Sequence, residues 1–116
     1  MMNAARLRRG ADIARCRAEG VARNDRLFSL RARPSGNDTV RVAVSASRAV
    51  GSAVRRNRAR RRLREAIRLE LSRRPVHPGA GMDLVFAARV AAIDAPAAAV
   101  RAAVARELGA VLGAAR

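Results

Sequence analysis

The sequence contains no lysine, tryptophan or tyrosine, and only one cysteine and one histidine. The single Cys16 excludes a disulfide framework and a cysteine-based metal site. Because Phe28 and Phe86 are the only aromatic residues, stacking of RNA bases on an aromatic sheet surface is largely excluded. No apolar run has the length of a membrane span or of a signal-peptide core. We therefore expect a cytoplasmic protein.

Acidic residues are scarce. Nine Asp and Glu stand against 25 basic residues, all of them arginine, which gives a net charge of +16 on 116 residues. A field this positive attracts polyanions such as nucleic acids. The acids form no carboxylate cluster, and Asp83 and Asp94 are interpreted as a strand start and a helix cap rather than as metal ligands. We therefore expect no catalytic side chain in this chain.

The arginines are concentrated in residues 55–68, RRNRARRRLREAIR, where eight of fourteen positions are arginine and Glu65 is the only acid. On a helix, like charges three and four residues apart repel one another. An external polyanion relieves this repulsion, and a guanidinium group binds phosphate oxygens two at a time. The segment therefore predicts a helix that binds nucleic acid.

Hydrophobic spacing predicts a helix near the start of the chain and the buried side of the arginine helix. Residues 1–6 are interpreted as a flexible tail and residues 7–116 as a single RNA-binding domain. An apolar stripe from Leu7 through Ala11, Ala14 and Ala18 predicts a first helix over residues 7–19. The arginine helix is expected over residues 52–73, with Ser52 as its cap and Pro75 as its stop. Its predicted buried stripe is Ala59, Leu63, Ala66, Ile67 and Leu71.

Alternating segments at residues 26–33 and 39–45 predict two strands. The PSGND sequence between them is typical of a turn, so we expect them to pair as an antiparallel hairpin, with Arg31, Arg33 and Arg41 on its outer face. Residues 82–89 predict a third strand, buried on both faces, and Asp94 the start of a last helix. The predicted order is helix, strand, strand, helix, strand, helix.

Residues 41–67, RVAVSASRAVGSAVRRNRARRRLREAI, resemble the signature of the protein component of bacterial ribonuclease P. In that family a strand ends in Ser-x-Ser-basic, here Ser45, Ser47 and Arg48. A hydrophobe-Gly-x-Ala-Val step follows, here residues 50–54. It leads into an Arg-Asn-Arg-x-basic-Arg helix, here residues 56–61. The rest of the chain follows the family's order more loosely.

The resemblance implies an α+β fold, a single two-layer domain in which a small mixed sheet of about four strands packs against helices. The arginine helix would join two parallel strands by a left-handed crossover, against the usual rule. The implied function is to assist a catalytic RNA in endonucleolytic removal of the 5′ leader from precursor tRNA. The implied partners are ribonuclease P RNA and precursor tRNA, with Mg²⁺ required by the RNA–protein holoenzyme.

The resemblance also implies two sets of site residues. The set expected to bind the RNA subunit is Arg55, Arg56, Asn57, Arg58, Arg60, Arg61, Arg64 and Arg68. The set expected to line the leader cleft is Ile13, Arg17, Arg31, Arg41, Ser45, Ser47 and Arg48. Where the family carries aromatics, this chain has Ile13, Arg17 and Arg31. We therefore expect phosphate contacts to replace base stacking, with stronger salt dependence and less base discrimination.

Other interpretations fit the composition. A small basic ribosomal protein that binds rRNA is the first alternative; a free-standing nuclease and an architectural DNA-binding protein are more distant. Arg31 and similar strand arginines are common on solvated sheet faces, and Ser45 and Ser47 are common at strand ends. Co-purification with ribosomal subunits, or with one structured non-ribosomal RNA, separates the first alternative from the ribonuclease P interpretation.

Overall fold

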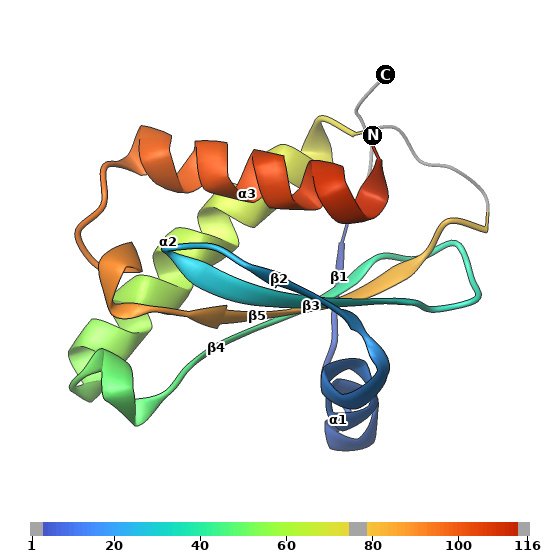
Figure 1. Ribbon diagram of the computed structural model, residues 1–116, viewed down its shortest axis with the longest axis horizontal. Helices are drawn as coiled ribbons and strands as arrows, with labels where there is room; N and C mark the ends of the chain where they lie inside the picture. The colour runs from blue at the N-terminus through green and yellow to red at the C-terminus, as the bar shows by residue number, and fades with distance from the viewer. Residues whose placement is uncertain (1–3, 75–78, 114–116) are drawn as a thin grey trace.

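The computed structural model describes residues 4–74 and 79–113, in which three helices surround a five-stranded sheet (Figure 1). The strands are β1 (Ala5–Arg6), β2 (Val21–Asn24), β3 (Phe28–Pro34), β4 (Arg41–Ala46) and β5 (Met82–Ala88). The helices are α1 (Gly10–Glu19), α2 (Ala53–Ser72) and α3 (Ala97–Leu112), with short 3-10 turns η1 (Arg48–Val50) and η2 (Val90–Ala92). The predicted α+β class with a small mixed sheet is confirmed.

The predicted hairpin is wrong, because β5 lies between the two strands. The strand order is β1-β4-β5-β3-β2, with β5 antiparallel to β3 and parallel to β4. Buried on both faces as predicted, β5 has a nearly continuous apolar run that suits the centre of a sheet. Because α2 joins the adjacent parallel strands β4 and β5, the expected crossover is present. Its hand stays a prediction.

Helices cover both faces of the sheet (Figure 1). On one face, α2 and α3 enclose the main core, where the rings of Phe28 and Phe86 have centroids 5.3 Å apart. On the other face, α1 covers a smaller core of Leu7, Cys16 and Val85. The expected two layers are thus supplemented by α1 on the opposite face.

The arginine helix, α2, follows its predicted pattern. The Ser52 hydroxyl caps it by accepting a hydrogen bond from the Arg55 N–H at 3.3 Å. Gly51 precedes the cap at φ 133°, a conformation that favours glycine. The predicted stripe is buried: Ala59, Leu63, Ala66, Ile67 and Leu71. The predicted stop at Pro75 lies outside the described residues. Because this stripe holds α2 on the sheet, the opposite side of the helix faces solvent.

The N-terminal segment differs from the predicted tail, since Ala5 and Arg6 form β1 along the outer edge of β4. The predicted first helix begins three residues late, at Gly10, because Leu7 is extended and buried instead of helical. Ala11, Ala14 and Ala18 are exposed, so the predicted stripe is wrong there. The face that packs on the sheet carries Ile13 and Cys16.

Two further differences lie at element ends. Asp94 does not cap α3: Pro96 occupies the cap position, and the helix begins at Ala97. The edge strand β2 was not predicted, because all four of its residues are exposed and show no apolar alternation. In the part of the chain that the structure describes, no helix is both long and apolar enough to cross a membrane.

Candidate nucleic-acid interface

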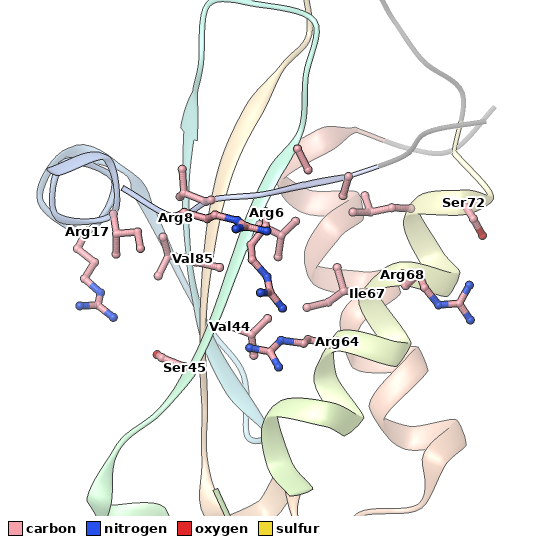
Figure 2. Close-up of a pocket in the computed structure, with 17 residues that line it drawn as sticks. Arg6, Arg8, Arg17, Val44, Ser45, Arg64, Ile67, Arg68, Ser72 and Val85 are labelled. Atoms are coloured by element: carbon pink, nitrogen blue, oxygen red, sulfur yellow. The ribbon is translucent and has the colours of Figure 1, made fainter. Parts of the chain in front are cut away.

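A cleft of about 790 Å³ lies between α1, the β1–β4 edge of the sheet and α2 (Figure 2). Because β1 pairs only with Arg41 and Val42, the rest of β4 borders the cleft at the edge of the sheet. Its lining there includes Val44 and Ser45. One wall is formed by α1, through Ile13 and Arg17, and the opposite wall by α2. The cleft thus follows an open sheet edge between two helices.

Five arginines from three segments line this cleft, and no described acidic residue does. They are Arg6 and Arg8 from the N-terminal segment, Arg17 from α1, and Arg64 and Arg68 from α2. Burial, and then the nearby charges of Arg6 and Arg60, lower the pKa of Arg64. A guanidinium group stays charged at neutral pH nevertheless. The cleft is therefore a positively charged channel suited to a polyanion.

The solvent side of α2 extends this charge beyond the cleft. Arg61, Arg64 and Arg68 are exposed there, at the three- and four-residue spacings that place side chains on one helix face. Arg68 donates to the exposed Glu65 at 2.7 Å, and this hydrogen bond lowers the pKa of Glu65. A pair so exposed contributes little to stability. These guanidinium groups are thus accessible to an external anion.

Other arginines of α2 are bound to the protein itself. Arg58 Nε donates to the Ile93 carbonyl at 3.0 Å. Arg62 donates from one nitrogen to the carbonyls of Ala92 and Ile93, at 2.8 and 2.9 Å, and from another to that of Ala95. Both side chains therefore hold the η2 region against α2. Their positive charge remains near the surface, but their hydrogen bonds already have partners.

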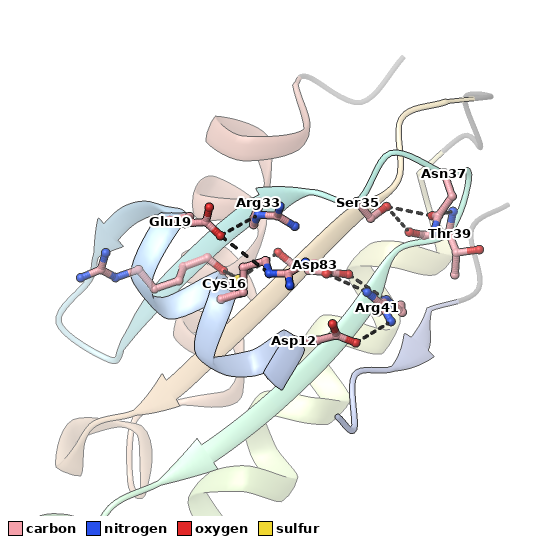
Figure 3. Close-up of polar contacts among 11 residues, drawn as sticks. Asp12, Cys16, Glu19, Arg33, Ser35, Asn37, Thr39, Arg41 and Asp83 are labelled. Carbon is pink, nitrogen blue, oxygen red and sulfur yellow. Dashed lines mark hydrogen bonds and ion pairs between the residues drawn. The ribbon is translucent and has the colours of Figure 1, made fainter. Parts of the chain in front are cut away.

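Arg41 is also tied into the fold (Figure 3). It binds the buried Asp83 with two hydrogen bonds of 2.8 Å, and Asp12 of α1 at 3.4 Å. The hydrogen bonds to Asp83 are the main reason that the pKa of Arg41 is raised. This two-point contact links α1 to the centre of the sheet. Arg41 thus holds the α1 wall in place instead of presenting a free guanidinium group.

The structure brings only part of each predicted set to the cleft. From the leader set, Ile13, Arg17 and Ser45 line it. The remaining members of that set are absent from its lining: Arg31, Arg41, Ser47 and Arg48. From the RNA-subunit set, Arg64 and Arg68 line it. The two predicted sets therefore meet in one continuous surface.

Arg6 was missed because residues 1–6 were interpreted as a tail, and Arg8 was missed because residues 7–19 were predicted to be helical. A signal is present in the sequence Arg6-Leu7-Arg8, where a basic, apolar, basic alternation fits a strand with one buried side chain. The remaining predicted α2 residues lie near the start of the helix. Arg55 and Asn57 are exposed, Arg56 donates to the Gly51 carbonyl at 3.2 Å, and Arg60 contacts the Asn57 side chain.

The fold and this surface define a class of protein. It is a small, basic α+β protein in which a helix, a sheet edge and an arginine-bearing crossover helix form one positively charged surface. The family model described as ribonuclease P matches residues 1–112. The ribonuclease P protein component of Chloroflexus aurantiacus is 45% identical over 97 residues, which cover 83% of this chain and 69% of the relative.

Solved structures agree with the sequence comparison. The ribonuclease P protein of Staphylococcus aureus superposes with a TM-score of 0.71 at 26% identity, covering 95% of this chain and 94% of that one. The Thermotoga maritima protein gives a TM-score of 0.73 at 25% identity, covering 96% and 98%. This chain belongs to the ribonuclease P protein component family. The predicted role as the RNA-binding protein subunit of this tRNA-processing endoribonuclease is confirmed, and the ribosomal alternative is not favoured.

Proposed function

We propose that the protein assists a catalytic RNA in removing the 5′ leader from precursor tRNA, with the RNA subunit against the solvent side of α2 and the leader in the cleft. The observation that carries this proposal is the continuity of the two surfaces at Arg64 and Arg68. One protein can thereby hold a single-stranded leader next to the RNA subunit. Arginine contacts to phosphates position RNA without reading its sequence.

We assign the chemical step to the RNA subunit and its Mg²⁺, which when bound supplies an activated water and stabilises charge on the phosphate. In the two described ranges, no group of three His, Cys, Asp or Glu residues could hold a metal ion. Asp12 and Asp83 are both bound to Arg41. The side chains of this chain therefore contribute binding and positioning. Because bacterial precursor tRNA is made in the cytoplasm, we place the holoenzyme there.

The test is reconstitution with ribonuclease P RNA and a precursor tRNA. We expect the protein to restore cleavage at a low Mg²⁺ concentration at which the RNA alone is nearly inactive, because its arginines replace part of the charge screening. Protein without RNA should not cleave. Cleavage by the protein alone would establish a free-standing nuclease instead, and equal rates with and without protein would refute the assisting role.

A further inference from the structure

The N-terminal segment directs two arginines into the cleft. The Ala5 N–H donates to the Val40 carbonyl at 2.9 Å and the Leu7 N–H to the Val42 carbonyl at 2.8 Å, so the backbone is fixed along β4. Leu7 is only 2% exposed and packs on the α1 side of the sheet. Since side chains alternate along an extended chain, Arg6 and Arg8 on either side of Leu7 point toward the α2 side.

A third arginine faces them from the opposite wall. Arg64 projects from α2 into the same cleft, and its guanidinium group lies close to that of Arg6 in Figure 2. The lowered pKa of Arg64 has the charge of Arg6 as its second cause, after burial. In the described ranges, none of the three forms an ion pair with an acid. Asp12 of α1 is paired with Arg41, and Glu65 of α2 is paired with Arg68.

Three guanidinium groups that converge without a carboxylate repel one another, and a bound anion relieves that repulsion. Val42 and Val44 line the same cleft, and their side chains have no hydrogen-bonding group with which to read a base edge. The site therefore suits a phosphate group of a nucleic-acid backbone, which accepts two hydrogen bonds from one guanidinium group.

We propose that Arg6, Arg8 and Arg64 form a phosphate-binding site for the precursor tRNA leader, at the end of the cleft closed by β1. This inference rests on the proposed function, and it adds the N-terminal segment to the substrate-binding surface. The leader would pass between β1 and α2, with its phosphates held by the arginines of both. Recognition at this site would be independent of leader sequence.

The test compares two double variants of the reconstituted holoenzyme. The cleft variant is Arg6→Gln with Arg8→Gln, and the control is Arg26→Gln with Arg101→Gln. Each removes two positive charges, and the control arginines are exposed and outside the cleft. The cleft variant should bind precursor tRNA about tenfold more weakly than wild type. For this variant the slope of log affinity against log salt should be less steep by about 1.4, because each lost contact to single-stranded RNA removes about 0.7. Mature tRNA, without a leader, should bind equally to all three proteins.

Neutral methylphosphonate linkages locate the contact. Each phosphate of the leader is replaced in turn by a methylphosphonate, and precursor tRNA binding is measured. Replacement at one or two positions should weaken binding to the wild-type holoenzyme and should have no effect on binding to the Arg6→Gln, Arg8→Gln variant. If the variant loses β1, seen as a lower unfolding temperature, the single variant Arg64→Gln on α2 gives the same comparison. Equal sensitivity of variant and wild type to every linkage would overturn the site, as would equal weakening of mature tRNA. If wild-type protein gives no leader-dependent binding at all, the proposed function itself fails.

Discussion

The neighbouring residues Arg61 and Arg62 should have opposite roles, although they carry the same charge. Arg62 donates three hydrogen bonds to carbonyls of the η2 region, whereas Arg61 is exposed. Replacing either by Met removes the guanidinium group and keeps an unbranched side chain of similar reach. We expect Arg62→Met to destabilise the fold and Arg61→Met to weaken RNA binding instead.

The magnitude follows from the contacts. Because Arg62 is only half-buried, each of its three hydrogen bonds is taken to contribute about 1 kcal/mol, the usual net value for a hydrogen bond in a protein. The Arg62→Met protein should therefore lose about 2–3 kcal/mol of unfolding free energy. At about 4 °C for each kcal/mol in a domain of this size, its Tm should fall by about 10 °C. Arg61→Met should change the Tm by less than about 2 °C, as expected for a surface residue.

The assay is urea unfolding of both variants, followed by circular dichroism, with RNA-subunit binding measured under conditions where both are folded. Arg62→Met should keep most of its affinity when folded, while Arg61→Met should lose about a factor of ten. Equal loss of stability in the two variants would refute the distinction. So would a stable Arg62→Met protein that binds RNA poorly.

Three further predictions concern the sheet and the face of it that α1 covers. Arg41→Gln should lower the unfolding free energy by about 2–3 kcal/mol, because it leaves the buried Asp83 without its partner. A double-mutant cycle with Asp83→Asn should show coupling between the two residues, and a fully stable Arg41→Gln protein would contradict this. Burial, and next the charge of Asp83, raise the pKa of the Cys16 thiol, so the unfolding free energy should fall as the pH rises above the thiol's pKa in the unfolded chain. Labelling of Cys16 by a disulfide reagent at pH 8 should be slow until urea unfolds the protein. Gly20→Ala should cost about 2 kcal/mol in urea unfolding, because its Cβ would lie 2.4 Å from the Cys16 carbonyl oxygen, and an unchanged midpoint would refute that close approach.

Sequence pattern predicts which side of an element is buried better than it predicts which elements are neighbours. The four-residue spacing of Leu63, Ile67 and Leu71 correctly predicted the buried side of α2, because helix geometry alone sets which residues share a side. The apolar run of β5 likewise correctly predicted a strand that is buried on both faces. The false hairpin arose because a turn sequence specifies a chain reversal but not hydrogen-bonded pairing. The strand β5, which follows α2 in the chain, is more apolar than β3 or β4 and takes the position between them.

The positive charge of the site could be predicted from the sequence. Which arginines bind within the protein and which face solvent could not. Sequence cannot distinguish a guanidinium group that binds a distant carbonyl, as at Arg62, from one that faces solvent, as at Arg61. Arg41 was assigned to the leader because its partners, Asp12 and Asp83, are far from it in sequence. Arg6 was missed because the alternation around Leu7 spans only three residues, which is a weak signal for a strand.

On this proposal the solvent side of α2 binds the RNA subunit through its exposed arginines. The affinity of the protein for ribonuclease P RNA is measured as a function of salt concentration for three proteins. They are wild type, the α2 variant Arg61→Gln with Arg68→Gln, and a control pair of exposed arginines outside α2, Arg26→Gln with Arg89→Gln. The α2 variant should lower the slope of log affinity against log salt by about 1.8, from 0.9 for each duplex phosphate contact. A control variant that lowers the slope equally would show that net charge, and not this surface, binds the RNA.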